Sequence, residues 1–128
     1  MKLHVMQALN KWEKRSFDYG DADCCQFAGF IVKELTGKDY LTDFNYTSED
    51  EAEEIIKSNG DLIKTASTVL GEPTDEDLPD GSPVLVDLPE GLTMGIKLDD
   101  YVVCLVKKGF TKIPEHLIIS GWKLCHKQ

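Results

Sequence analysis

Residues 17–37 read FDYGDADCCQFAGFIVKELTG, and this stretch decides the fold. A polar loop stops at the start of a mostly apolar run, where Asp21 or Asp23 can cap a helix by accepting from the free amides of its first turn. Gly37 suits the left-handed conformation that closes a helix. Apolar residues between these ends follow helical spacing and occupy most of the circumference. The pattern predicts a helix at the centre of a domain.

Two adjacent cysteines stand at the start of this helix. Cys24 would be its first residue, where unpaired backbone amides and the positive end of the helix dipole favour a thiolate over a thiol. Papain-like enzymes place their nucleophile at such a point. Cys24 and Cys25 can equally be small buried residues, as free cysteines usually are. Spacing alone leaves both interpretations open.

Short motifs over most of the chain carry a family resemblance. They are Trp12, the aromatic-x-aromatic-Gly loop at 17–20, Asp23-Cys24, LTG at 35–37, GSPVLV at 81–86, TMGI at 93–96 and Gly121-Trp122. Asp23-Cys24 with its loop and the two later segments resembles the NlpC-like cysteine peptidases of bacterial cell walls. More narrowly, a compact NlpC-like family encoded in bacteriophage tail gene clusters is resembled by Trp12, the loop at 17–20, Asp23-Cys24, LTG at 35–37 and Gly121-Trp122.

The resemblance implies a papain-like α+β fold, with N-terminal helices packed on a small C-terminal antiparallel sheet in one domain, residues 1–128. It implies Cys24 as the nucleophile position, with Asp23 before it. The family's third polar residue would fall near Cys104. The histidine expected at the start of the TMGI strand is Thr93, which cannot take a proton from a thiol near neutral pH.

Other positions also depart from the family pattern. The tyrosine of the loop is Phe17, which lacks the hydroxyl, and Asp21 replaces a glycine with a carboxylate that disfavours a nearby thiolate. Among the three histidines, His4 would lie at the surface of the first helix and His126 near the chain end. His116, before the last strand, is the one candidate for a substitute base.

The chain has 128 residues, 41% hydrophobic and 29% charged, which suits one globular domain. A formal net charge of -9 argues against nucleic-acid and anionic-membrane partners, since counterion release needs cations. No apolar run approaches the roughly 18 residues of a membrane span. The first 15 residues mix charges throughout and predict no signal peptide, so we expect synthesis in a cytoplasm with reduced thiols.

The spacing of the cysteines argues against a cofactor. Cys24, Cys25, Cys104 and Cys125 contain no C-x-x-C pair, so neither a zinc site nor an iron–sulfur cluster is expected. A disulfide framework is unsupported in a chain long enough to do without one. The acidic run at 49–51 starts a helix, and the acidic residues between 74 and 80 are expected to form a solvated loop.

Periodicity predicts helices first and strands afterwards. Helices are expected at 2–15, from the Ser48-x-x-Glu51 capping box to Gly60, and from Asp61 to Gly71. Strands rich in β-branched and aromatic residues are expected at 84–86, 92–98, 101–106, 110–113 and 122–125. Helices followed by a meander of short strands predict an α+β layer arrangement.

Three functions fit these motifs. The first is a structural or assembly protein of a bacteriophage tail tip, made in the host cytoplasm, located in the virion tail and bound to other tail proteins. The second is an active cysteine endopeptidase or amidase that cleaves peptidoglycan stem peptides through a thioester at Cys24. The third is a small intracellular binding or inhibitor module. Threonine at position 93 favours the first.

Overall fold

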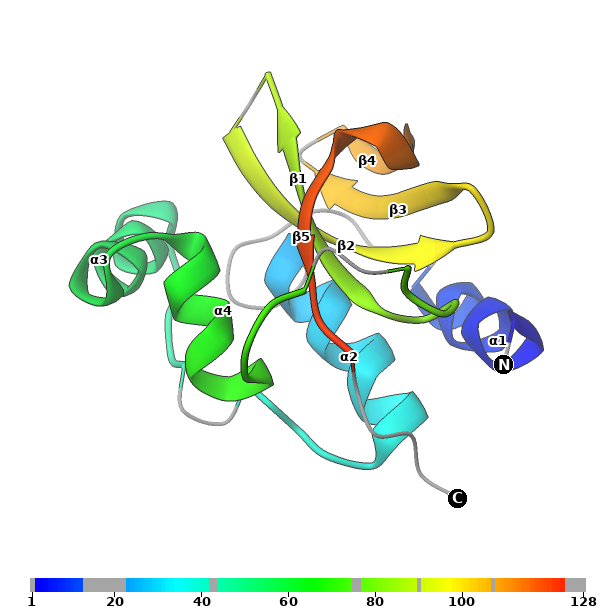
Figure 1. Cartoon of the computed structure of the whole chain (residues 1–128). Coiled ribbons are helices and arrows are strands. Elements are labelled where there is room, and N and C mark those ends of the chain that lie inside the picture. The colour runs from blue at the N-terminus through cyan, green and yellow to red at the C-terminus, as the bar shows by residue number, and fades with distance from the viewer. Residues whose placement is uncertain are drawn as a thin grey trace.

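The structure is a computed structural model of the chain. It describes residues 2–12, 23–41, 44–74, 77–89, 91–106 and 108–123. These residues form an α+β domain in which helices lie against one face of an antiparallel sheet (Figure 1). The predicted α+β class is confirmed. No helix in the described ranges is both long enough and apolar enough to span a membrane.

Helices come first along the chain and strands second. The helices are α1 (Lys2–Trp12), α2 (Cys24–Thr36), α3 (Glu49–Asn59) and α4 (Leu62–Leu70). The strands are β1 (Pro83–Leu88), β2 (Gly91–Leu98), β3 (Tyr101–Val106), β4 (Gly109–Pro114) and β5 (Ile118–Gly121), with a 3₁₀ turn, η1 (Glu115–Leu117), before β5. The sheet order is β4-β3-β2-β1-β5, and neighbouring strands are antiparallel.

Local capping sets the helix ends. Of the two candidate caps for α2, Asp23 is the one used: its Oδ1 accepts from the Gln26 N–H at 2.8 Å. Gly37 ends the helix with a φ of 81°, in the left-handed region that a glycine adopts without strain. The predicted caps of α3 and α4 are also confirmed, since Ser48 and Asp61 accept from main-chain amides three residues later.

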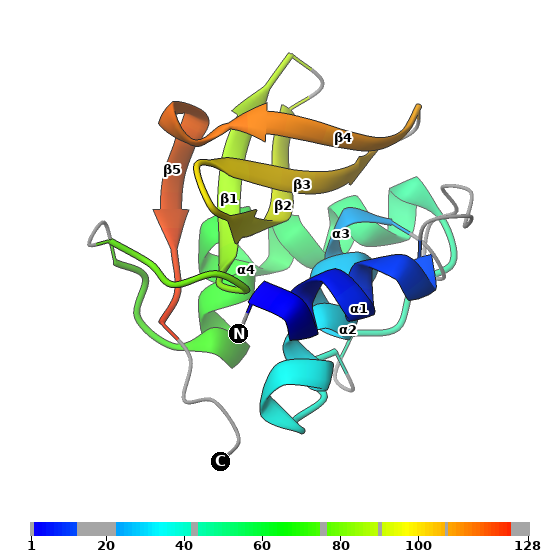
Figure 2. The same ribbon diagram turned by 90° about the vertical axis from the view of Figure 1, so that its right-hand side faces the viewer.

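α2 is the central helix, and it lies directly beneath the sheet (Figure 2). Phe27, Ala28 and Ile31 are buried in a cluster that includes Ile96 of β2 and Leu105 of β3. Burying each large side chain of this kind contributes about 1.5–3 kcal/mol. The prediction that this face of α2 rests on the sheet is therefore confirmed. By contrast, α3 has no buried residue.

A second apolar cluster lies on the opposite face of the sheet. Side chains alternate between the two faces of a strand, so Val103 and Leu105 of β3 face α2 while Val102 and Cys104 face away. The members of this second cluster come from strands, η1 and the loop before β1, and include no residue of an α-helix.

The position of the last strand differs from the prediction. We expected strand at 122–125, but β5 is Ile118–Gly121, and Trp122 follows it as a core residue outside the strand; residues 124 and 125 lie outside the described part of the chain. The Trp122 Nε1–H donates to the Gly71 carbonyl at 3.1 Å, and its main-chain N–H donates to the Pro83 carbonyl at 3.1 Å. The tryptophan therefore anchors the end of β5 to α4 instead of extending the sheet.

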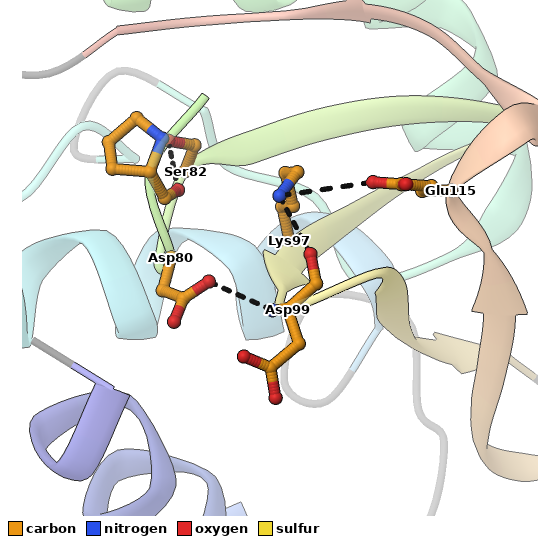
Figure 3. A network of polar contacts seen from close by, with 6 residues as sticks. Asp80, Ser82, Lys97, Asp99 and Glu115 are labelled. Carbon is orange, nitrogen blue, oxygen red and sulfur yellow. Dashed lines mark hydrogen bonds and ion pairs between the residues drawn. The ribbon is translucent and has the colours of Figure 1, made fainter. Parts of the chain in front are cut away.

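Polar contacts close the corner where β2 turns into β3 (Figure 3). The Asp80 Oδ1 accepts from the Asp99 main-chain N–H at 2.8 Å. The Lys97 Nζ donates to the Asp99 carbonyl at 2.8 Å and forms an ion pair with Glu115 at 4.0 Å. Asp99 has a φ of 54°, a left-handed conformation that aspartate tolerates better than most residues. These contacts tie the loop before β1 and η1 to the turn.

Candidate functional site

The two ends of β2 are paired differently. All of β1 pairs with β2, from Pro83↔Ile96 to Leu88↔Gly91. The pairing of β2 with β3 covers the last part of β2, from Leu98↔Tyr101 back to Ile96↔Val103. Within the described residues, the first part of β2 thus has a free edge on the side of β3. The start of α2 lies beside this edge.

Cys24 lies against the free edge of β2. The Lys97 N–H donates to the Ser82 carbonyl, toward β1. Since successive residues of a strand turn their amides to opposite neighbours, the Met94 N–H points away from β1. A hydrogen bond from the Met94 backbone to the Cys24 sulfur is one of the interactions that lower the pKa of Cys24. The unpaired strand edge thus supplies a donor to the thiol.

The two adjacent thiols have opposite tendencies to ionise. Their Sγ atoms are 4.0 Å apart. The pKa of Cys24 is lowered, chiefly because the Cys25 thiol donates a hydrogen bond to it, and burial and the Asp23 charge only partly oppose this effect. The pKa of Cys25 is raised well above its ordinary value, because its proton is held in that bond and its side chain is removed from water. Cys24 is therefore the member of the pair that ionises at the lower pH.

Asp23 links the cysteine helix to the loop before α3. It is 3% exposed, and its Oδ2 accepts from the Tyr46 hydroxyl at 2.6 Å. The pKa of Tyr46 is raised, first by burial and also by its hydrogen bond to Asp23, so Tyr46 stays a donor. Sequence reasoning gave Tyr46 no role at this site. No local pattern could connect two residues 23 positions apart.

Cys24 lines a cavity of about 650 Å³. Thr93 lines the same cavity; it is 6% exposed and its Oγ1 donates to the Gly91 carbonyl at 3.2 Å. The structure therefore brings together the predicted nucleophile position and the position where the resembled family carries its histidine. No histidine is among the described residues that line the cavity.

The charged side chains around this cavity are mostly acidic. Among the described lining residues, four are carboxylates and one is a lysine: Asp23, Glu49, Glu53, Asp61 and Lys108. Glu53 belongs to the exposed face of α3, and Asp61 caps α4. The lining of the cavity thus combines the two thiols with several carboxylates.

The remaining predicted site residues lie elsewhere. Cys104 is buried on the face of the sheet opposite α2, and burial raises its pKa to about 12. His116 is exposed in η1 and does not line the cavity. Several sequence predictions fall outside the described residues: Phe17, Asp21, Cys125, His126 and the side chain of His4. In the described part of the chain, no three metal-ligating side chains are grouped.

The fold and the site define an α+β domain with a thiol pair at the start of its central helix. The model of a protein family described as Domain of unknown function (DUF6950) matches residues 2–124. The chain belongs to this family. No curated protein matches the sequence.

Proposed function

We propose that the chain is an NlpC-like, papain-fold domain that has kept the position of the nucleophile but does not hydrolyse peptides. Three observations support this proposal. Cys24 starts the central helix, that helix packs on an antiparallel sheet, and the sulfur lies beside the strand that carries residue 93. The sequence motifs at Asp23-Cys24 and at 93–96 supply the resemblance on which the fold name rests.

The main argument against hydrolysis is the presence of Thr93, in place of a histidine, in the cavity of Cys24. Peptide cleavage needs a group that takes the thiol proton and later protonates the leaving amine, and such acid–base help contributes about 10²–10⁴-fold to the rate. Threonine can do neither near neutral pH. The helix terminus stabilises the thiolate by roughly 0.3–1 kcal/mol, which does not replace proton transfer to the leaving group.

For the biological role, we propose a structural or assembly protein of a bacteriophage tail tip, located in the virion tail after synthesis in the host cytoplasm. The support is the resemblance to the compact NlpC-like family of tail gene clusters. Its partners would be other tail proteins. We expect virions that encode this chain to contain it in fixed proportion to the tail proteins, measured by quantitative mass spectrometry. Its absence from purified virions would contradict the tail role.

One observation favours a second function, an active cysteine endopeptidase or amidase acting on peptidoglycan stem peptides. The Cys24 pKa is lowered, and the Met94 amide lies at its sulfur. Such amides could also hold an oxyanion in the transition state. In this alternative another group would replace the histidine, and His116 or a residue outside the described ranges would have to reach Cys24.

Incubation with peptidoglycan separates the two functions. Purified protein and its Cys24→Ala variant are incubated with peptidoglycan and with free stem peptides, and new amino termini are counted by labelling and mass spectrometry. We expect the two proteins to give equal, background amounts. Release by the wild-type protein alone would establish the hydrolase, and His116→Ala would then show whether His116 acts as its base.

A further inference from the structure

Cys24 has the features of a reactive thiolate even where a base for hydrolysis is absent. Its sulfur accepts from the Cys25 thiol and the Met94 amide, and it lines a cavity large enough for a small molecule. Thiol–disulfide exchange needs only a thiolate and a disulfide that can reach it. This chemistry therefore remains open to the site when peptide cleavage is not.

We propose that Cys24 is a site of S-thiolation. Its substrate is a small, positively charged disulfide formed from two aminothiols, and one aminothiol half of that disulfide is transferred to the Cys24 sulfur. The proposal goes beyond the function argued above, and it holds whether or not the chain is part of a tail. It concerns one cysteine of the four in the sequence.

The exchange is balanced within the two reactants. The Cys24 thiolate, its proton lost to solvent, attacks one sulfur of the disulfide. A bond forms between the Cys24 sulfur and that sulfur while the disulfide bond of the reagent breaks. The departing thiolate takes a proton from solvent and leaves as a free aminothiol. The Cys24 sulfur is oxidised, the departing sulfur is reduced, and no further oxidant is needed.

The geometry selects Cys24 over the other described thiols. Cys25 lines the larger cavity as well, but its proton is held in the hydrogen bond to Cys24, and its side chain also borders a separate apolar cavity of about 90 Å³ among α2, α3 and α4. Cys104 is fully buried on the far face of the sheet. Among the described thiols, Cys24 alone combines a lowered pKa with a place in the lining of the larger cavity.

The mixed disulfide should persist, because Cys25 cannot displace the bound thiol. Consecutive Cα atoms are about 3.8 Å apart, whereas disulfides span about 4.4–6.8 Å between Cα atoms. The two sulfurs are 4.0 Å apart, about twice the length of a disulfide bond. Closing a Cys24–Cys25 disulfide would require the first turn of α2 to open, and the Asp23 cap opposes that.

The charge of the cavity selects the class of disulfide. Its described lining carries four carboxylates and one lysine. The whole chain has a formal net charge of -9. A cationic disulfide is therefore attracted to Cys24, and an anionic disulfide of the same length is repelled.

The test compares cystamine, which carries two ammonium groups, with dithiodipropionate, which carries two carboxylates. Reduced, reductant-free full-length protein is mixed with each at neutral pH and low ionic strength, and intact mass and peptide mapping follow the adduct. We expect one aminothiol per chain, on Cys24, formed about tenfold faster than the anionic adduct. The two rates should converge as salt is added, and dithiothreitol should restore the original mass.

Variants sharpen the result. Glu53→Gln should reduce the preference for cystamine, whereas Glu54→Gln, an exposed neighbour on α3 that does not line the cavity, should leave it unchanged. Cys24→Ser should abolish the adduct, and peptide mapping of the wild-type protein locates the adduct even if that variant folds poorly. Modification at another cysteine, equal rates for both reagents at low salt, or spontaneous replacement of the adduct by an internal disulfide would overturn the proposal.

Discussion

The two ends of β2 differ in how their edge toward β3 is used. At the end near Leu98 the strand pairs with β3 and turns through Asp99, and the turn is held by Asp80 and Lys97 (Figure 3). At the end near Gly91 the described pairing with β3 has stopped, and the freed edge faces the Cys24 thiol. One end of β2 therefore closes in a hydrogen-bonded turn at Asp99, which we call the closed corner. The other end borders the cavity of Cys24, which we call the open end.

This difference shows how a sheet can supply a chemical site. Where neighbouring strands pair, their amides are satisfied by carbonyl groups. Where one strand leaves, the amide on the free edge needs another acceptor, and here the Cys24 sulfur provides it. The open end is supported from behind by apolar packing, whereas the closed end relies on polar contacts near the surface. Four substitutions test this contrast.

The largest effect should come from Phe27→Ala, which removes apolar support behind Cys24. Phe27 is fully buried and its ring packs edge-on against Trp12 and Phe110, with centroids 5.9 and 5.1 Å away. Lost burial and the resulting cavity should lower the free energy of unfolding by about 3–5 kcal/mol, measured by urea denaturation. Phe30→Ala, at a half-buried position of the same helix, serves as control. An equal loss in both variants would contradict the central role of Phe27.

Gly95→Ala should have the next largest effect, because Gly95 lies where β2 and β3 begin to separate. A Cβ there would come within 2.6 Å of Val102, 2.7 Å of the Cys104 sulfur and 3.0 Å of the Val103 carbonyl oxygen. The contact with backbone cannot be relieved by a side-chain rotation, so we expect a loss of about 1–3 kcal/mol. In a Cys104→Ala background the added methyl group should cost less. Full additivity would show that Cys104 does not contact position 95.

Asp80→Ala should have a smaller effect at the closed corner. It removes the acceptor for the Asp99 main-chain N–H. A hydrogen bond of this kind contributes about 0.5–1.5 kcal/mol, and we expect a loss in that range by thermal denaturation. Asp77→Ala, at an exposed position of the same loop, should change stability less. A loss as large as that of Phe27→Ala would mean that polar contacts, not apolar packing, dominate the domain.

The smallest effect is a shift in the pH dependence of Cys24 alkylation. Because the Cys24 pKa is lowered, its thiolate forms at lower pH than that of an ordinary cysteine, and alkylation by iodoacetamide should rise at correspondingly lower pH. Cys25→Ala removes the main cause and should move the midpoint to higher pH. Cys104→Ala should leave it in place, since Cys104 is not among the causes. An unmoved midpoint in Cys25→Ala would assign the low pKa to backbone amides.

The candidate site was partly predictable. The motif at Asp23-Cys24 predicted the helix start, and the motif at 93–96 predicted that Thr93 would lie near it, as their shared cavity shows. The hydroxyl of Tyr46 on Asp23 and the Met94 amide at the sulfur were not predicted. The Met94 amide has no signature in residue type, since any residue other than proline carries the same amide. The Tyr46 hydroxyl lies 23 positions from Asp23, so no local pattern links the two.

The sequence by itself determined the ends of α2, α3 and α4 and the order of helices before strands, while the predicted end of the first helix at residue 15 lies outside the described residues. Asp23, Ser48 and Asp61 cap helices through hydrogen bonds to residues three positions later, so the local sequence is enough to predict these caps. The prediction of strand at Trp122 was wrong, because this side chain is buried in the core and bonds to the Gly71 carbonyl, far away in the chain.

Only the tertiary structure decided where β3 stops pairing with β2, and hence which backbone amide meets Cys24. It also decided that carboxylates of α3 and α4 line the cavity of Cys24 and Thr93. These features arise from segments 20 to 70 residues apart that meet only when the apolar face of α2 is buried against the sheet. The packing of the whole domain determines these features, and no local sequence pattern predicts that packing.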